Sequence, residues 1–453
     1  MASASTSELA HPVVFTTQTP YPLPSQKFMI PATWKRYQLS QLVNKALSLP
    51  KPVPFEFLVQ GEVLRATLAE WCAEKGVGEV QTLEIEYFES VMPPQRMSSL
   101  PHEDWVSSIS CQIPGYFLTA SYDGAVRVFD YSQKLLHTVS AHTAPVSSIA
   151  VVPSHDSHLI ASASHDLTAH LTRIDLSPIA GPSKAQTLAS LHLHTAPLSS
   201  VAANASGSHI LTSSWDGLIG LWDTSIPTAD EVPADETAGG GDRKKRRKVT
   251  EDSEAVRPKR KAPAAVLKSH TARISRVVFG RDGSAYSCGF DSTVRTWDVE
   301  NGVCAATITA SSKPFLDLAL SQDGKTALAA STDRTVCQYD LRASTSSATT
   351  PSVASLAHPA TPSSIAVPQA GSANEHQLVT GAYDGVVRLW DLRSTKSAVA
   401  AFTAWEGGKE KDGGPKKVLS VDWARGMVDV GGEGGVEVWK IGEVERMSVS
   451  DSA

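Results

Sequence analysis

The chain has 453 residues, of which 41% are hydrophobic and 19% are charged, and its formal net charge is −6. This composition is typical of a soluble globular protein, and the negative balance argues against nucleic-acid binding through the charge of the whole molecule. We expect neither a membrane-spanning helix nor a secretory signal, because no run of about 18 apolar residues occurs and the N-terminus lacks a basic segment followed by an apolar one.

The sequence of residues 12–93 predicts a small domain with both strands and helices. Apolar strands at Val13–Phe15 and Lys27–Pro31 are expected to form a hairpin, and apolar residues from Leu39 to Leu49 recur at helical spacing. Further strands are expected at 55–59, from 63 and at 83–87, with a second helix at 67–75 that ends at Gly76. The order strand, strand, helix, strand, strand, helix, strand resembles a ubiquitin-like (β-grasp) fold. Residues 94–103 are expected to be a linker.

An acidic residue in a tight turn, followed by an alternating strand, recurs along the rest of the chain. The clearest copy is Asp384-Gly385 followed by Val386–Asp391. Asp-Gly suits a turn that needs positive φ, and the alternation places one face of the strand against a neighbouring sheet. A spacing of roughly 40 to 45 residues predicts a mainly β chain with a seven-bladed propeller at residues 104–449. The seven turn acids are Asp123, Asp166, Asp216, Asp291, Asp333, Asp384 and Glu433.

These repeats resemble the WD-repeat family, in which the turn Asp belongs to a structural network with an upstream His, a Ser or Thr, and a Trp. Five of the acids have a suitable histidine upstream, namely His102, His142, His194, His270 and His358. The resemblance implies that these residues stabilise the fold. No catalytic triad can be recognised, so an enzyme is not predicted. The outer strand of the last blade could come from residues 91–99 or from 445–449.

The interval between the third and fourth turn acids is too long for one blade. We expect residues 226–264 to form a disordered basic loop, because they contain few apolar residues and many charges. Two basic clusters lie within it: Arg243, Lys244, Lys245, Arg246, Arg247 and Lys248, and then Lys259, Arg260 and Lys261. Such clusters are typical of a nuclear localisation signal, and direct RNA contact or a merely solvated segment are the alternatives.

The residue before each turn acid should point to the same end of the propeller in every blade. In five blades it is aromatic or an imidazole: Tyr122, His165, Trp215, Phe290 and Tyr383. A ring of such side chains predicts a partner-binding surface. The alternative is that the rings only pad the neighbouring blade.

Several segments of the two modules resemble one family of ribosome-assembly factors. The segments are Trp34–Tyr37, Lys51–Val59, Gly61–Arg65, Leu83–Tyr87 and His102–Ser108. They are similar to the Notchless-like (NLE) domain and the first repeat of the WD-repeat subunit of the pescadillo–block-of-proliferation (PeBoW-type) complex. The resemblance implies a non-catalytic factor for the 60S subunit, acting in pre-rRNA processing at the 27S/ITS2 stage in the nucleolus and nucleoplasm. The implied partners are the Erb-type block-of-proliferation WD protein, pescadillo, the AAA+ ATPase midasin and the pre-60S particle, with no membrane.

The resemblance also implies a role for one acidic side chain of the ubiquitin-like domain. In the family, such an acid completes the coordination of a Mg²⁺ ion held by the metal-ion-dependent adhesion site of midasin. Mg²⁺ prefers oxygen ligands, so one carboxylate supplied in trans is chemically sufficient. Glu79 is the acid in the loop before the last strand, and Glu84 and Glu86 are rivals. No cofactor of the chain's own is expected.

Two other functions remain open. A WD-repeat substrate receptor of a ubiquitin ligase would need a helical box for a ligase adaptor, and none is visible. A direct rRNA-binding factor would act through the basic loop. A propeller fold alone does not distinguish these functions.

Overall fold

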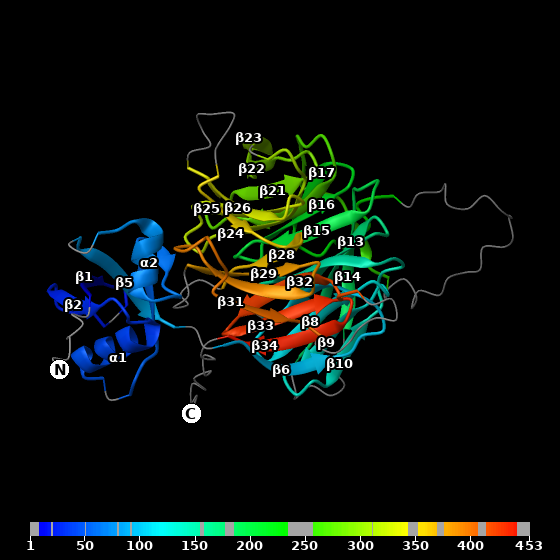
Figure 1. Cartoon of the computed structure of the whole chain (residues 1–453). Coiled ribbons are helices and arrows are strands. Elements are labelled where there is room, and N and C mark those ends of the chain that lie inside the picture. The colour runs from blue at the N-terminus through cyan, green and yellow to red at the C-terminus, as the bar shows by residue number, and fades with distance from the viewer. Residues whose placement is uncertain are drawn as a thin grey trace, which may run out of the picture. The chain divides into compact units, whose positions relative to one another are not determined.

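The computed structural model describes residues 9–19, 21–49, 51–78, 81–90, 93–154, 158–176, 185–233, 257–309, 311–342, 352–368, 376–405 and 414–441. Two compact units divide the chain: Met1–Pro93 with Asp391–Ser397, and Pro94–Trp390 with Ala398–Ala453. Strands dominate both units (Figure 1). Neither helix in the described ranges is long and apolar enough to cross a bilayer.

The first unit is a five-stranded sheet with two helices. Its strand order is β2-β1-β5-β3-β4, in which β1 runs parallel to β5 and the other pairs are antiparallel. The predicted order of elements and the ubiquitin-like fold are therefore confirmed. The elements are β1 (Ala10–Thr16), β2 (Lys27–Pro31), α1 (Arg36–Leu47), β3 (Phe55–Val59), β4 (Glu62–Val63), α2 (Leu68–Lys75) and β5 (Leu83–Glu89).

Local chemistry sets the ends of α2. Thr67 and Glu70 form a reciprocal capping box, in which each side chain accepts the backbone N–H of the other residue at 3.1–3.2 Å. Gly76 ends the helix with a φ of 66°, a conformation that glycine adopts without a Cβ clash. The apolar face of α1 contributes Leu39 and Val43 to the core, where both are fully buried.

The second unit consists of seven sheets, six with four strands and one with five. We call the first strand of each sheet in chain order its inner strand, except that in blade seven the outer strand, β6, comes first in the chain. The inner strands of successive sheets contact one another in a closed cycle, which makes a β-propeller. Blades one to three contain β7 (Val106–Ser110), β8 (Tyr116–Ser121), β9 (Val126–Asp130) and β10 (Leu135–Val139); β11 (Val146–Val152), β12 (His158–Ser164), β13 (Thr168–Ile174) and β14 (Ala185–His192); and β15 (Leu198–Ala203), β16 (His209–Ser214), β17 (Leu218–Asp223) and β19 (Ala265–Lys268).

Blades four to seven follow the same plan. They contain β20 (Ile274–Phe279), β21 (Ala285–Gly289), β22 (Val294–Asp298) and β23 (Val303–Ile308); β24 (Phe315–Leu320), β25 (Thr326–Ser331), β26 (Thr335–Asp340) and β27 (Ala354–Ala357); β28 (Pro362–Ala366), β29 (Gln377–Ala382), β30 (Val386–Asp391) and β31 (Ala400–Thr403); and β32 (Val418–Ala424), β33 (Met427–Gly432), β34 (Gly435–Lys440) and β6 (Gln95–Leu100).

A repeated hydrogen bond joins the inner strands around a central cavity of about 470 Å³. At six of the seven junctions, a side-chain oxygen of one inner strand accepts a backbone N–H of an adjacent one at 2.7–3.5 Å. At the junction of blades four and five, the ion pair of Arg276 with Asp317 takes its place, with Nε and Oδ1 3.4 Å apart. The accepting side chains are Ser108, Ser148, Ser200, Asp317, Ser364 and Ser420.

The propeller closes through a segment that was expected to be linker. Residues 95–100, within the predicted linker 94–103, form β6 and pair antiparallel with β34 as the outer strand of blade seven. Arg96 of β6 is 2.7 Å from the fully buried carboxylate of Glu437 on β34. The linker assignment is therefore wrong for these six residues, and the first of the two closures left open by the sequence is the one observed. Residues 445–449 lie outside the described part of the chain.

The prediction that residues 226–264 form a disordered loop is wrong for the C-terminal part of this range. Lys259–Lys261 form β18, which pairs in parallel with β14 as a fifth strand of blade two. The side chain of Lys261 is only 1% exposed, and its Nζ is 2.6 Å from Oδ1 of Asp223. Its burial makes the Lys261 side chain part of the fold, so it is not available as a localisation signal. Residues 234–256, with the cluster Arg243–Lys248, lie outside the described ranges.

Candidate docking face

One end of the propeller is built by the same backbone hydrogen bond in all seven blades. The residue that enters the turn between the second and third strands donates its N–H to a carbonyl in the loop before the first strand, at 2.9–3.1 Å. The repetition places both residues of each pair at the same end of every blade. The donors are Tyr122, His165, Trp215, Phe290, Thr332, Tyr383 and Glu433, and the acceptors are Trp105, Pro145, Pro197, Arg273, Pro314, Thr361 and Lys417.

Aromatic side chains form a continuous arc at this end of blades one to three. The ring centroids of Trp105 and Tyr122 are 5.8 Å apart, those of Tyr122 and His165 are 6.5 Å apart, and those of His165 and Trp215 are 5.2 Å apart. Trp105 and Trp215 are 40% and 42% exposed. We call Trp105, Tyr122, His165, Trp215, Phe290 and Tyr383, together with Arg273 and Lys417, the aromatic face.

Two cations extend the aromatic face. The guanidinium carbon of Arg273 lies 3.4 Å from the ring centroid of Phe290 and 5.5 Å from that of Trp215. Lys417 lies 6.0 Å from the Trp105 ring. Burial raises the pKa of Tyr383, while the positive charges of Lys417 and Arg273 act in the opposite direction. The five residues predicted from the sequence thus share one end of the propeller with a second tryptophan, Trp105, and with two cations that were not predicted.

Trp105, Arg273 and Lys417 occupy equivalent positions, immediately before the first strand of blades one, four and seven. The sequence does carry this signal, because each residue directly precedes a buried apolar residue that opens an inner strand: Val106, Ile274 and Val418. In three other blades the same position holds proline. The position is visible only when the repeats are aligned by their inner strands and not by their turn acids.

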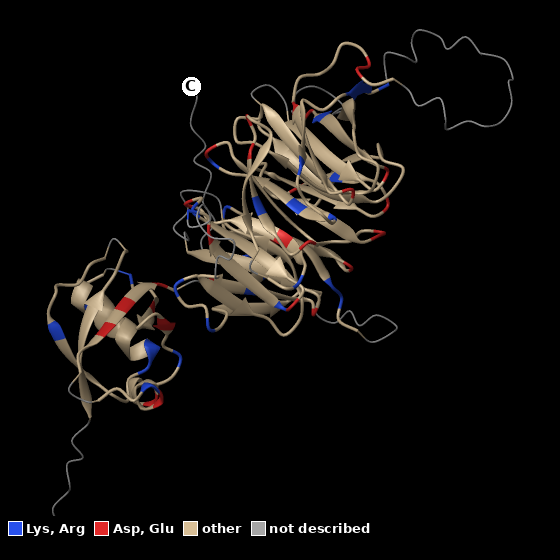
Figure 2. Cartoon of the chain, turned by 90° about the horizontal axis from the view of Figure 1, so that it is seen from above, with Lys and Arg blue, Asp and Glu red and all other residues tan. Residues whose placement is uncertain are grey.

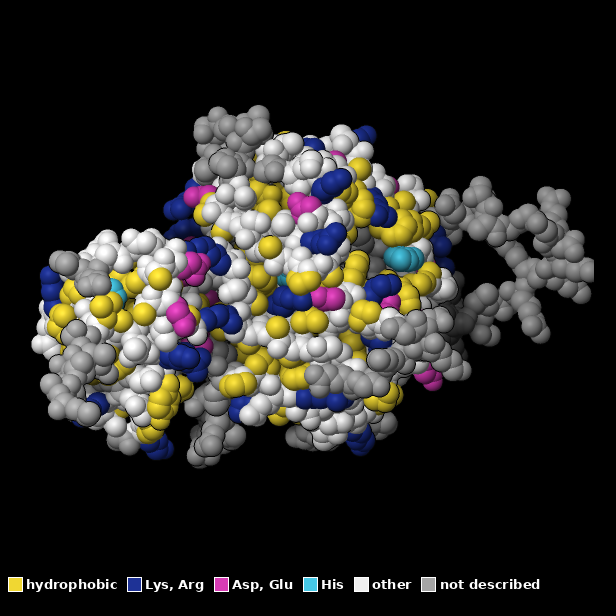
Figure 3. Space-filling view, in the orientation of Figure 1, with side chains coloured by type: hydrophobic (Ala, Val, Ile, Leu, Met, Phe, Trp, Pro, Cys, Tyr) yellow, Lys and Arg dark blue, Asp and Glu magenta, His cyan; other side chains and the backbone are white. Residues whose placement is uncertain are grey.

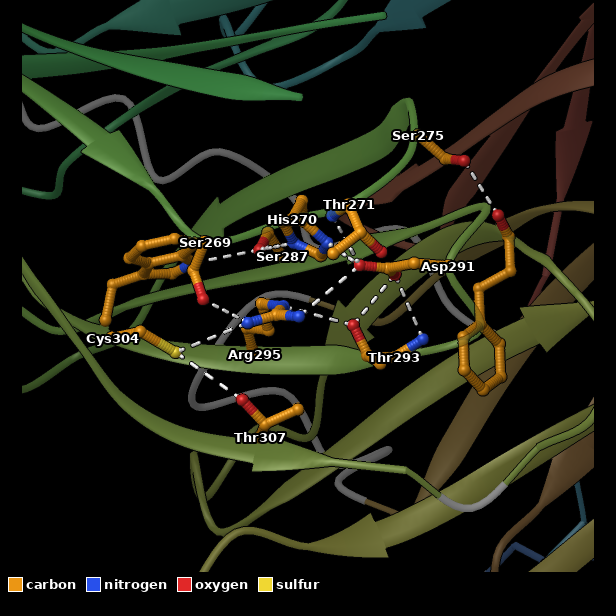
Figure 4. Close-up of polar contacts among 12 residues, drawn as sticks. Ser269, His270, Thr271, Ser275, Ser287, Asp291, Thr293, Arg295, Cys304 and Thr307 are labelled. Atoms are coloured by element: carbon orange, nitrogen blue, oxygen red, sulfur yellow. Dashed lines mark hydrogen bonds and ion pairs between the residues drawn. The ribbon is translucent and has the colours of Figure 1, made fainter. Parts of the chain in front are cut away.

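A buried polar network supports the aromatic face in blades two, three and four. The turn acid and the upstream histidine are in contact there: Nδ1 of His142, His194 and His270 lies 2.8–3.1 Å from Oδ2 of Asp166, Asp216 and Asp291. In blades three and four the network continues, because Thr212 and Ser287 bond both the histidine Nε2 and the indole N–H of Trp222 and Trp297. Figure 4 shows the blade-four network around Asp291 and Arg295.

Blades one and six depart from the expected histidine–acid contact. Arg127 and Arg388, four residues after Asp123 and Asp384, take those carboxylates instead. The corresponding imidazoles turn to backbone oxygens: His102 Nδ1 contacts Leu100 O at 3.1 Å, and His358 Nδ1 contacts Leu356 O at 3.0 Å. Arg388 binds Asp384 through two N–H groups, whereas Arg127 divides its N–H groups between Asp123 and Ser121. In blade four, Arg295 and His270 share Asp291, so an arginine at this position does not by itself exclude the histidine.

The turn acids Asp166 and Asp291 are held ionised by their donors. Burial raises the pKa of Asp291, but the His270 hydrogen bond and charge, with donors from Thr293 and Thr271, hold it well below the ordinary value. The same opposing causes lower the pKa of Asp166. Stability from these groups is present above the pKa of an unfolded Asp and is lost only in strong acid. The network is therefore structural throughout the neutral range.

The turn of blade seven differs from the other six. Gly432 pairs directly with Gly435, so that Glu433 and Gly434 form a two-residue hairpin. Glu433 consequently occupies the place of Tyr122 in the backbone pattern, not the place of Asp123. Its carboxylate still accepts the backbone N–H of Lys417 at 2.9 Å. In blade five, Asp333 accepts the N–H of Thr335 at 3.0 Å.

Glu79 lies outside the described residues, whereas its rival Glu84 is exposed on β5. In the described ranges, no three His, Cys, Asp or Glu side chains are grouped so that they could hold a metal ion. Charged residues of both signs are interspersed over both units (Figure 2), and apolar side chains lie in small groups among them on the side seen in Figure 3. Neither view shows a field of one sign.

Both modules match families of known proteins. Residues 12–72 match the NLE (NUC135) domain, and residues 95–130, 133–172, 185–223, 261–298, 302–340 and 351–391 match the WD domain, G-beta repeat. The ribosome biogenesis protein YTM1 of Laccaria bicolor is 60% identical, over 98% of both chains. That of Coprinopsis cinerea is 57% identical over 97% of this chain and 96% of its own. That of Saccharomyces cerevisiae is 32% identical over 90% of this chain and 92% of its own.

Proposed function

The chain belongs to the YTM1 family of WD-repeat ribosome biogenesis proteins, and from this premise we propose that it is a non-catalytic assembly factor of the 60S subunit. It acts in pre-rRNA processing at the 27S/ITS2 stage, in the nucleolus and nucleoplasm, with pescadillo and the Erb-type block-of-proliferation WD protein. The propeller holds the chain to its partner. The ubiquitin-like domain engages midasin, which releases the complex from the pre-60S particle.

The aromatic face is the surface that we propose for the block-of-proliferation protein. Exposed tryptophan and tyrosine side chains on a rigid scaffold are the residues that contribute most to protein interfaces, because they bury much area at little conformational cost. The repeated backbone bonds fix the loops that carry these side chains. The observation that supports this assignment is the unbroken arc from Trp105 to Trp215.

A pair of tyrosines of matched exposure tests the assignment. Tyr383 on the aromatic face is 38% exposed, and Tyr131, which follows β9 at the other end of blade one, is 41% exposed. Tyr383→Ala should weaken binding to the purified block-of-proliferation propeller by about tenfold or more, the effect of losing a central aromatic contact. Tyr131→Ala should leave the Kd measured by calorimetry unchanged. Equal effects of the two substitutions would remove the aromatic face from consideration.

The ubiquitin-like domain supplies the second proposed contact. Its β-grasp topology and its match to the NLE domain support the proposal that an acid in the loop before β5 serves as an oxygen ligand in trans. We assign this role to Glu79. The Mg²⁺ of the midasin adhesion site would supply a strong, directional attraction for one carboxylate, because Mg²⁺ takes oxygen ligands in a fixed octahedral geometry. This chain contributes the carboxylate and the fold that presents it.

Glu79→Gln keeps the size of the side chain and removes its charge. We expect this variant to lose Mg²⁺-dependent binding to the isolated midasin adhesion domain in a pull-down. Glu84→Gln, a substitution at an exposed position of β5, is the matched control and should bind like the wild type. If Glu84→Gln abolishes binding and Glu79→Gln does not, the ligand has been assigned to the wrong residue.

The cluster Arg243–Lys248 is proposed to direct nuclear import. Six consecutive basic residues suit a receptor that reads an extended segment. Direct rRNA contact by the same cluster is the second candidate, and it predicts a steep salt dependence of RNA binding in a filter assay that disappears when residues 243–248 are replaced.

A further inference from the structure

Arg273 is the most unusual residue of the aromatic face. It ends the loop before β20, its backbone carbonyl accepts the N–H of Phe290 at 2.9 Å, and its guanidinium carbon lies 3.4 Å from the Phe290 ring centroid. Trp215 of the preceding blade flanks it at 5.5 Å. A guanidinium that lies over aromatic rings keeps its N–H groups, which lie in its own plane, available to a ligand.

Three arginines that follow a turn acid by four residues already hold its carboxylate. Arg127 pairs with Asp123, Arg295 with Asp291 and Arg388 with Asp384. Within the described ranges, no acidic side chain pairs with Arg273, although its side chain is exposed. The guanidinium is therefore held in place by the two rings and not by an anion of this chain. Little side-chain entropy remains to be lost when it binds one.

Charges of both signs surround Arg273 toward blades five to seven. Exposed Lys313, Asp333 and Arg334 belong to the loops and turns at the same end of blade five. In blade seven, Nζ of Lys417 is 3.3 Å from Oε1 of Glu433. The acidic residues Glu103 and Asp104 precede Trp105 in blade one. Of the two cations of the aromatic face, Lys417 therefore already has an acidic partner, and Arg273 is the one that no acid in the described ranges pairs. A complementary partner carries negative charge next to apolar side chains.

We propose that Arg273 receives a carboxylate of a partner protein, an Asp or Glu that is flanked in its own chain by apolar or aromatic side chains. The guanidinium binds the two carboxylate oxygens through parallel N–H groups, and the flanking side chains pack on Trp215 and Phe290. Exclusion of water by the rings strengthens this ion pair relative to one at an open surface. The inference rests on the proposed function, because it describes the chemistry of the docking contact on the same face.

The test measures binding of the full chain to the purified block-of-proliferation propeller at several NaCl concentrations. Arg273→Gln should raise the Kd by about 10- to 100-fold and flatten its salt dependence, the effect of losing a desolvated charge pair. Arg273→Lys keeps the charge but not the bidentate, stacked geometry, so its Kd should lie between those of the wild type and Arg273→Gln. Arg281→Gln, at an exposed position near the other end of blade four, is the matched control and should bind like the wild type.

The outcomes separate this inference from the proposed function. Wild-type binding that is lost in Tyr383→Ala but is unchanged in Arg273→Gln would retain the docking face and overturn the carboxylate contact. An absence of wild-type binding would overturn the proposed partner and the inference together. If Arg273→Gln instead weakened the binding of a pre-rRNA fragment and left the protein complex intact, the anion would be a phosphate, and the assignment to a partner carboxylate would be wrong.

Discussion

Replacing Arg96 by methionine should weaken the closure of the propeller. Arg96 lies on β6, and its Nη2 is 2.7 Å from Oε1 of Glu437, whose side chain has no exposed surface. Methionine keeps an apolar stem of similar length and removes the charge. The Glu437 carboxylate then stays buried, with the indole N–H of Trp439 at 3.1 Å as its remaining donor on Oε2. A buried carboxylate that has lost its ion-pair partner lowers the stability of the folded state.

The magnitude follows from the burial of the two partners. Removing one member of a fully buried ion pair costs about 3–5 kcal/mol. The Arg96 side chain is 47% exposed, so water screens the pair, and we expect a loss of about 2–3 kcal/mol. In a unit of this size, such a loss lowers the Tm by about 5 °C, which differential scanning calorimetry resolves. Arg342→Met is the matched control, because solvent screens its pair with Asp340 and the pair should contribute little to stability.

A double variant separates the charge effect from lost packing. Arg96→Met combined with Glu437→Gln has no buried charge left, so it should recover a large part of the lost stability. If Arg96→Met lowered the Tm no more than Arg342→Met does, β6 would not close the propeller through this pair, and the reasoning would be refuted.

Three further expectations concern acid stability, Lys261 and nuclear import. Burial lowers the pKa of His358 to about 4, from an ordinary value of 6.5, so between these pH values the unfolded chain binds a proton that the folded chain rejects. The free energy of unfolding should therefore decrease by up to about 1.4 kcal/mol for each unit by which the pH is lowered in that window. His358→Gln should show a smaller Tm difference between pH 7 and pH 5 than the wild type. An equal difference would mean that His358 does not titrate this way. Lys261→Met should lower the Tm while Lys259→Met does not, since the Lys261 side chain is 1% exposed and pairs with a carboxylate. If neither substitution changed the Tm, the pairing of β18 with blade two would not contribute to stability. Alanine in place of Arg243–Lys248 should move a fluorescent fusion out of the nucleus, and undiminished nuclear signal would place the import signal elsewhere.

Much of the fold is predictable from local pattern. The Asp-Gly turns predict the hairpins because glycine alone accepts positive φ without strain, as Gly124 and Gly385 do at 82° and 75°. The alternating strands that follow these turns predict which side chains enter the core. The order of elements in the ubiquitin-like domain follows from helical spacing and from Gly76, for the same physical reasons.

The structure differs from the expectations drawn from the sequence where a residue's role depends on a partner that is distant in the chain. Gln95–Leu100 has little apolar alternation, so nothing local marks it as a strand; its pairing is with β34, at the opposite end of the propeller sequence. Lys261 belongs to a basic cluster by composition, and its burial depends on contacts with Asp223 and Ser225, which precede the insertion. Arg127 and Arg388 take two of the acids from histidines, a competition that spacing alone does not decide.

The aromatic face was predictable in part for the same reason. Tyr122 and its equivalents precede a recognisable turn acid, so their common end follows from the repeat. Arg273 and Trp105 precede an inner strand instead, and their place on the face depends on the backbone bond to the turn. The cation that organises the site was therefore missed, although the aromatic residues around it were found.

The central claim is that two separable contacts, one on each unit, hold this chain on the pre-60S particle and then release it. Sucrose-gradient sedimentation of tagged chains from nuclear extract tests this claim most directly. We expect a Trp105→Ala/Trp215→Ala variant to leave the pre-60S fractions for the free pool, and Glu79→Gln to accumulate in the pre-60S fractions beyond the wild-type level. Sedimentation of both variants like the wild type, or a shift of both in the same direction, would contradict the account.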